Sequence, residues 1–141
     1  MSEVSAAGLP PVIVFVVDDE ILIHDLLRDP LEEAGYSVLV AATGAEAIKA
    51  LEGDEADEIK ALVTDVNLGP KSASGWDVAR RARELQTDIP VVYVTGDSGH
   101  EWASQGVPNS MLIKKPFAPA QVVTAVSRLI NNASSGSPAT A

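Results

Sequence analysis

The sequence predicts an α/β fold: a doubly wound sheet of five parallel strands with helices on both faces. Two observations lead to this prediction. Short apolar runs such as 12–17 and 61–64 have the length of buried strands, and stretches with helical periodicity separate them. Strands that alternate with helices are joined by right-handed crossovers and become parallel. The chain has 141 residues, of which 46% are hydrophobic, and this suits a single packed domain.

The first two strands are expected at 12–17 and 37–41. An amphipathic helix over 20–34 lies between them and ends at Gly35, a residue that favours helix termination. Pro30 lies inside this helix and has no N–H for the helical hydrogen bond. We therefore expect Pro30 to kink or shorten the helix.

The middle of the chain repeats the alternation of strand and helix. Thr43 can cap a helix over 45–51, which consists of good helix formers. A third strand is expected at 61–65, a helix at 76–85 and a fourth strand at 91–95. These elements complete the central part of the predicted sheet.

The last third of the chain supplies the final strand and helix. A short helix is expected near 101–105 and the fifth strand at 110–114. Apolar residues recur at helical spacing over 119–130, which predicts the last helix.

One folded domain is expected over residues 11–131. Residues 1–10 have the character of a flexible arm. Residues 132–141 are small and polar and are expected to form a disordered tail.

Composition narrows the class of protein. The net charge is −10, from ten basic and twenty acidic residues, so a nucleic-acid partner is not expected. No apolar run approaches the ~20 residues of a membrane-spanning helix, and the N-terminus has no basic region followed by an apolar one, as a secretory signal would. The chain has no cysteine. These features suit a cytoplasmic protein without a membrane partner.

Acidic and cationic side chains follow the predicted strands. Asp18 and Asp19 come directly after the first strand, and Asp65 ends the third. Thr95 ends the fourth strand, and Lys115 follows the fifth. Because the carboxyl ends of parallel strands share one edge of the sheet, these side chains are expected to meet in one pocket.

Such a pocket suits a divalent cation and phosphoryl chemistry. Carboxylates that lie together repel each other unless cations separate them, and a single lysine neutralises only one. Oxygen ligands without cysteine or clustered histidine favour Mg²⁺. An ionised aspartate can accept a phosphoryl group, and Mg²⁺ with a lysine can neutralise the charge of that transfer.

The motifs around these residues resemble a known family. They are Val17-Asp18-Asp19-Glu20, Asp65, Thr95-Gly96 and Lys115-Pro116-Phe117, with thirty positions from Asp65 to Thr95 and twenty from Thr95 to Lys115. In their order and spacing they resemble the receiver domains of bacterial two-component response regulators, over about residues 12 to 131. The resemblance implies a flavodoxin-like fold with strand order 2-1-3-4-5.

Residue by residue, the resemblance implies a metal site and a phosphoacceptor. Asp65 would accept the phosphoryl group. Asp19 and Asp65 would bind Mg²⁺, with Asp18 acting mainly through water, and the backbone carbonyl of Asn67 would complete the protein ligands. Asn67 and Asp97 are also candidates for tuning self-dephosphorylation.

The resemblance assigns further roles to Lys115 and Thr95. Lys115, rather than the neighbouring Lys114, would pair with Asp65 and then with the phosphoryl group, next to a Lys-Pro peptide that the family typically holds in cis. Thr95 would be the switch hydroxyl. The phosphoryl donor would be a sensor histidine kinase or a phosphotransfer protein, and the chain would act as a stand-alone regulator on an unidentified protein target.

Two alternatives remain open on the sequence. The family usually has Tyr or Phe at the position of Leu112, so the chain could be a phosphate-independent interaction module with a vestigial pocket. A Mg²⁺-dependent aspartyl phosphatase is less well supported, because such enzymes carry Asp-x-Asp after the first strand and this chain has Asp18-Asp19-Glu20.

Other polar residues are expected to have ordinary surface roles. We predict that His24 is an exposed helical residue near a docking face. The simplest interpretation of the helix over 76–85 is that its arginines form a solvated face, at Arg80, Arg81 and Arg83.

Overall fold

A computed structural model describes residues 12–54, 56–70, 73–96 and 98–135. Its five strands form a single sheet in the order β2-β1-β3-β4-β5, and every pair of neighbours is parallel. The predicted fold class and strand order are therefore confirmed. In chain order, the strands and helices are β1 (Ile13–Val17), α1 (Ile21–Glu33), β2 (Ser37–Ala41), α2 (Gly44–Leu51), the 3-10 helix η1 (Ala56–Glu58), β3 (Ile59–Asp65), α3 (Gly75–Leu85), β4 (Val91–Thr95), the 3-10 helix η2 (Ser98–Glu101), α4 (Trp102–Gln105), β5 (Ser110–Lys114) and α5 (Pro119–Ser135).

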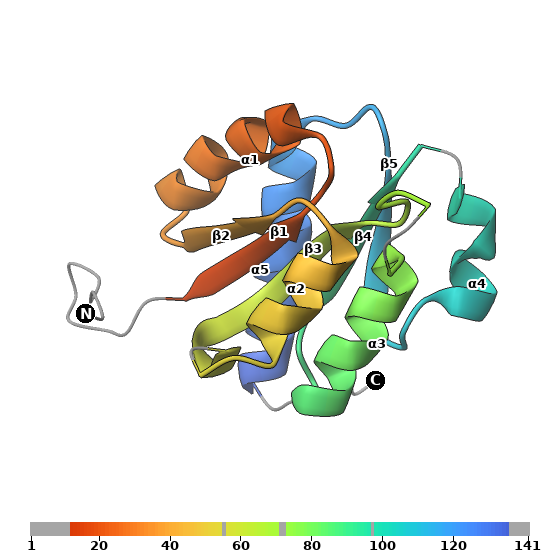
Figure 1. Ribbon diagram of the computed structural model, residues 1–141. Coiled ribbons are helices and arrows are strands. Elements are labelled where there is room, and N and C mark those ends of the chain that lie inside the picture. Colours follow the sequence, from red (N-terminus) through yellow and green to blue (C-terminus); the bar gives the residue numbers. More distant parts are fainter. Residues whose placement is uncertain (1–11, 55, 71–72, 97, 136–141) are drawn as a thin grey trace.

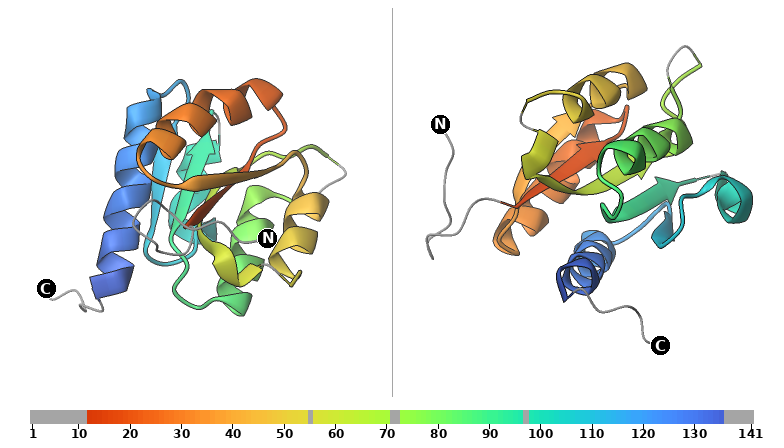
Figure 2. Two further views of the ribbon diagram at one scale, coloured as in Figure 1. Left: turned by 90° about the vertical axis from the view of Figure 1, so that its left-hand side faces the viewer. Right: turned by 90° about the horizontal axis from the view of Figure 1, so that it is seen from below.

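The sheet separates two apolar layers (Figures 1 and 2). Helices α2 and α3 cover one face, and α1 and α5 cover the other. Successive side chains of a strand point to opposite faces, so in β1 Phe15 and Val17 join the α2–α3 layer while Val14 and Val16 join the α1–α5 layer. Both layers need apolar side chains, which explains why the central strands have continuous apolar sequences rather than alternating ones.

The register of the sheet brings the polar strand ends to one edge. Val17 of β1 pairs with Thr64 of β3, so the residues that follow both strands are neighbours. Asp65 pairs with Val94, and Thr95 is the next residue of β4. The same edge continues to β5, where Lys114 pairs with Thr95.

The start of one strand needs correction, and Pro30 does not have the shortening effect that was expected as one possibility. β3 begins at Ile59 rather than at 61, because Ile59 is buried and extends the strand. Pro30 does not shorten α1, which continues to Glu33. Leu27 and Leu31, on either side of the proline, are fully buried, and their packing offsets the missing N–H.

The last helix is longer than predicted. α5 extends past residue 130 to Ser135, and so includes the first residues of the segment predicted as a tail. No glycine or proline that would end the helix occurs in the sequence between Pro119 and Gly136. The predicted arm, 1–10, and the rest of the predicted tail lie outside the described residues.

The arginines of α3 do not form a uniformly solvated face. Arg83 is half-buried, and its Nε donates to the carbonyl oxygen of Ile89 at 2.7 Å while Nη1 donates to that of Pro108 at 2.6 Å. Burial lowers the pKa of Arg83 below its ordinary value. Arg83 therefore joins the segment before β4 to the segment before β5, a role that its spacing along the helix did not reveal.

Within the described residues, none of the helices combines the length and the apolar composition that a membrane crossing requires.

Candidate functional site

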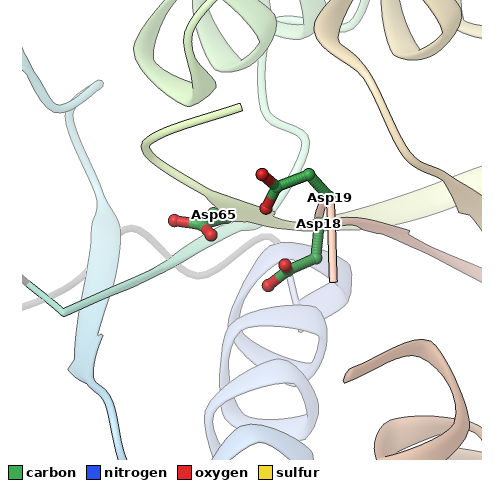
Figure 3. A group of neighbouring side chains, drawn as sticks. All are labelled: Asp18, Asp19 and Asp65. Atoms are coloured by element: carbon green, nitrogen blue, oxygen red, sulfur yellow. The ribbon is translucent and has the colours of Figure 1, made fainter. Parts of the chain in front are cut away.

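The ends of β1 and β3 bring three aspartates together. Asp18 and Asp19 follow β1, and Asp65 is the last residue of β3. Their side chains point to the same side of the strand ends (Figure 3), and one carboxylate oxygen of each lies within 4.8 Å of the others. Asp18 and Asp65 are buried, whereas Asp19 is exposed. The three aspartates therefore lie close together, as the sequence predicted.

A single ammonium group is shared by this pocket. The Nζ atom of Lys115 lies 3.1 Å from Asp18 Oδ2, 3.0 Å from Asp65 Oδ2 and 3.0 Å from Glu20 Oε1. The backbone places it there, because the Lys115 N–H donates to the carbonyl oxygen of Thr95 at 2.9 Å. The contact with Asp65 joins the two residues that the sequence placed at the centre of the site.

The segment Lys114-Lys115-Pro116 also has the geometry that was expected. Lys114 is exposed, while the side chain of Lys115 is 19% exposed and faces the pocket. The peptide bond between Lys115 and Pro116 is cis, as the resemblance implied.

Burial and charge shift the pKa values of Asp18, Asp65 and Lys115. Removal from water raises the pKa of Asp18, and the charge of Asp65 raises it further, against a hydrogen bond from the Glu20 N–H. Burial is also the main cause that raises the pKa of Asp65, against the attraction of Lys115. For Lys115, burial alone would lower the pKa, but its bonds to Asp65 and Glu20 outweigh burial and raise it. The lysine remains charged, and the buried acids resist ionisation.

The donor set suits a hard divalent cation. The Oδ2 atom of Asp18 is the buried side-chain polar atom that, among the described residues, makes no hydrogen bond. It lies 3.1 Å from Lys115 Nζ, so this contact is an ion pair without hydrogen-bond geometry. Because the same ammonium group also contacts Asp65 and Glu20, it does not neutralise all of these carboxylates, and a further cation would lower the cost of burying them. Asp18, Asp19 and Asp65 offer only oxygen ligands, which are those that Mg²⁺ prefers.

The three residues that follow β3 alternate between buried and exposed positions. Val66 and Leu68 are buried in the layer under α2 and α3, while Asn67 between them is exposed. The backbone N–H of Asn67 donates to Asp65 Oδ1 at 3.2 Å. Asn67 is thus next to the carboxylate that the sequence singled out, and its assignment as a metal ligand through the carbonyl stays a prediction.

Thr95 lies at the same edge of the sheet. It is the last residue of β4, it is 1% exposed, and its carbonyl oxygen is bonded to Lys115. Its assignment as a switch hydroxyl stays a prediction. Asp97, the other residue proposed to tune dephosphorylation, lies outside the described residues.

The prediction for His24 was wrong. His24 is 5% exposed, and its Nε2 lies 2.8 Å from the carbonyl oxygen of Asp18. The signal was its spacing, because His24, Leu27 and Leu31 occupy one face of α1. Sequence reasoning also gave no role to Glu20, whose carboxylate binds Lys115.

Comparison with known proteins agrees with this geometry. The model of the response regulator receiver domain matches residues 14–127. The chain belongs to the response regulator receiver domain family. Its acidic edge is the acidic pocket of a receiver domain, and the receiver belongs to the two-component class of signalling proteins.

Similar receiver proteins are known from several bacteria. The crystal structure of a response regulator receiver protein from Sinorhizobium medicae is 43% identical, has a TM-score of 0.79, and the match covers 86% of this chain and 95% of that one. The receiver domain of the sensor histidine kinase PA1611 from Pseudomonas aeruginosa shares the fold at 20% identity and a TM-score of 0.71, with 86% and 98% covered. Its active-site cleft coordinates a magnesium ion.

Among curated relatives, the response regulator SaeR of Staphylococcus epidermidis is 29% identical over 119 residues, which are 83% of this chain and 49% of SaeR. The receiver thus spans about half the length of the curated relatives it matches.

Proposed function

We propose that this receiver accepts a phosphoryl group on Asp65 in the presence of Mg²⁺ and signals through a phosphorylation-dependent change of its protein-binding face. The observation that carries the proposal is that Asp18, Asp19 and Asp65 meet at one edge of the sheet, beside the ammonium group of Lys115. Membership of the receiver family and the magnesium in the cleft of the PA1611 receiver domain support it.

Asp65 is the best-placed acceptor. It ends β3, one of its oxygens is bonded to Lys115 Nζ at 3.0 Å, and the other is bonded to the Asn67 N–H at 3.2 Å. An Asp65 oxygen would attack the phosphorus atom; the P–N bond of a donor phosphohistidine breaks as the new P–O bond forms, and the departing imidazole takes a proton from solvent.

The other residues position the transfer and neutralise its charge. Asp18, Asp19 and Asp65 would hold Mg²⁺, with the Asn67 carbonyl as a further ligand, and the bound ion would neutralise phosphoryl oxygens and orient them. Lys115, already within 3.0 Å of Asp65 Oδ2, would follow the charge as it moves onto the phosphoryl group.

The partners follow from the same chemistry. A receiver takes its phosphoryl group from a phosphohistidine, so we propose a sensor histidine kinase or a phosphotransfer protein as the donor. Thr95, at the end of β4 and bonded through its carbonyl to Lys115, would carry the change toward β5 by donating its hydroxyl to the phosphoryl group. The downstream target is a protein rather than a nucleic acid, because the net charge of −10 repels phosphate backbones.

The proposal is tested by the intact mass of the protein after incubation with acetyl phosphate and Mg²⁺. Wild type is expected to gain one phosphoryl group that hydroxylamine removes, as it does from an acyl phosphate. Asp65→Asn and wild type in EDTA are expected to gain none. Asp25→Asn, an exposed aspartate of α1, is the matched control and should be phosphorylated like wild type.

Two results would contradict the proposal. An adduct that persists in Asp65→Asn would place the acceptor elsewhere. No adduct in wild type, together with no binding of beryllofluoride, would favour a phosphate-independent interaction module with a vestigial pocket. Catalytic turnover of a generic phosphomonoester would instead favour an aspartyl phosphatase.

A further inference from the structure

His24 ties the first helix back to the end of the first strand. It lies on the inward face of α1 with Leu27 and Leu31, and all three residues are buried. Its Nε2 lies 2.8 Å from the carbonyl oxygen of Asp18, six residues earlier. Because a carbonyl oxygen can only accept, Nε2 carries the proton and donates it.

The polar groups of Asp18 are bonded in three directions. Its N–H donates to the carbonyl oxygen of Ala41 in β2 at 3.1 Å, and its carbonyl oxygen accepts from His24. Its side-chain Oδ1 accepts from the Glu20 N–H at 2.9 Å. Asp18 is 0% exposed, so in the folded protein this carbonyl oxygen is shielded from water and has the imidazole as its partner. The remaining atom, Oδ2, faces Lys115.

We propose that His24 is a positioning residue for the cation site. This inference rests on the proposed function, since it concerns the same pocket. The bond from His24 fixes the peptide group between Asp18 and Asp19, and therefore the direction in which both carboxylates leave the backbone. Hydrogen bonds behind the ligands of a metal site commonly change metal affinity by about 10- to 100-fold when they are removed.

A role in packing alone predicts a different response to substitution. If His24 only fills space between α1 and the sheet, Leu of similar size serves as well. If its N–H holds the Asp18 carbonyl, Leu fails and Gln, whose amide nitrogen can reach the same oxygen, restores the function. The comparison of His24→Leu with His24→Gln therefore separates the two roles.

The experiment is a Mg²⁺ titration of the full chain, followed by the backbone amide signals of Asp19 and Glu20 in NMR spectra. His24→Leu is expected to weaken Mg²⁺ binding by about tenfold or more, and His24→Gln to bind close to wild type. In EDTA, the Glu20 amide proton, which is bonded to Asp18 Oδ1, is expected to exchange with solvent faster in His24→Leu. His24→Met is a second variant without a donor, for use if the Leu variant fails to fold.

Leu31→Val is the matched control for general destabilisation. It removes buried apolar volume from the same face of α1, about two turns beyond His24. It is expected to lower the thermal midpoint without changing the affinity for Mg²⁺. Wild-type affinity in both donor-free variants, or an equal loss in Leu31→Val, would overturn the positioning role. An absence of saturable Mg²⁺-dependent shifts in wild type would overturn the proposed function itself, and this inference with it.

Discussion

Gly75 and Asp65 are in such close contact that only glycine fits at the start of α3. A Cβ atom on residue 75 would lie 1.9 Å from the carbonyl oxygen of Asp65 and 2.8 Å from the Cα of Val66. The Gly75 N–H donates to the carbonyl oxygen of Val66 at 2.7 Å. Helix α3 therefore starts directly against the end of the strand that carries Asp65, the proposed phosphoryl acceptor.

Gly75→Ala is expected to destabilise the protein and to disturb the site. The clash is with backbone atoms that no rotamer change can move, so the start of α3 or the end of β3 must shift. The cost of such overpacking is about 1–3 kcal/mol. Urea unfolding should show this loss, and phosphorylation of Asp65 by acetyl phosphate should slow because its carbonyl is displaced.

Gly53→Ala is the matched control for that substitution. The Cβ atom added at 53 would meet its nearest neighbour, the carbonyl oxygen of Ala50, at 3.4 Å, which is an ordinary contact. We expect near wild-type stability and phosphorylation. Equal losses in both alanine variants would show that the contact between Gly75 and Asp65 has no special cost.

Substitutions of the adjacent residues Lys114 and Lys115 are expected to have different effects on the stability of the protein. Lys115→Met removes the ammonium group that contacts Asp18, Glu20 and Asp65, and leaves the buried acids without a counter-charge. In EDTA the expected loss is about 1–3 kcal/mol, and saturating Mg²⁺ should recover part of it. Lys114→Met, at the exposed neighbouring position, should change little.

Thermal unfolding with and without Mg²⁺ measures this contrast. If the two methionine variants lose the same stability in EDTA, the ammonium group of Lys115 contributes no more than a surface charge. That result would also weaken the argument that the pocket needs a cation.

The residues at the strand ends could be found from the sequence because topology alone brings them together. In a parallel sheet, whatever follows β1 and β3 must meet at one edge, so Asp18 and Asp65 needed no knowledge of side-chain packing. His24 did need it. His24 lies on the apolar face of α1 with Leu27 and Leu31. A polar residue at such a position is not expected to be buried until its hydrogen-bond partner, the carbonyl oxygen of Asp18, is known.

Pro30 shows a second limit of sequence reasoning. The local rule that proline disrupts a helix is correct, but it does not include the burial of the neighbouring turns. Leu27 and Leu31 are both 0% exposed, and their contact with the sheet outweighs one missing hydrogen bond. Tertiary burial is absent from a local pattern, so the pattern alone did not show that α1 would continue through Pro30 to Glu33.

The buried charge of Asp18 predicts a dependence of stability on pH. Burial raises the pKa of Asp18 in the folded protein and outweighs the attraction of Lys115, so ionisation of this carboxyl opposes folding. The penalty is absent below the unfolded pKa of about 3.9 and is fully present above the raised folded pKa. Asp18→Asn removes the charge and keeps an oxygen to accept the Glu20 N–H. In EDTA at neutral pH it should therefore unfold at a higher temperature than wild type.

This difference should shrink as the pH falls and disappear below the ordinary pKa of aspartate, where the wild-type carboxyl is protonated in both states. Mg²⁺ should stabilise wild type more than Asp18→Asn. Thermal midpoints across a pH series give the result directly, with Asp25→Asn on the exposed face of α1 as control. A midpoint for Asp18→Asn below that of wild type at neutral pH in EDTA would show that the attraction of Lys115 outweighs burial.

The hydroxyl of Tyr93 connects strand β4, which ends at Thr95, to the segment before β5. Tyr93 is 0% exposed, and its hydroxyl accepts the backbone N–H of Val107 at 3.1 Å. Tyr93 also pairs in register with Leu112, where the family usually has an aromatic residue, and lies two positions before Thr95. Tyr93→Phe keeps the ring against Trp76, whose centroid is 4.6 Å away, and removes the hydroxyl alone.

The buried N–H of Val107 would then lose this acceptor, at a cost of about 1–3 kcal/mol. Urea unfolding measures the loss, and faster amide exchange at Val107 locates it. Tyr36→Phe is the control, because its hydroxyl bonds the part-buried Ser127 Oγ at 2.8 Å, and water can replace that bond. We expect a smaller loss there. Unchanged exchange at Val107 in Tyr93→Phe would mean that the hydroxyl does not hold this segment.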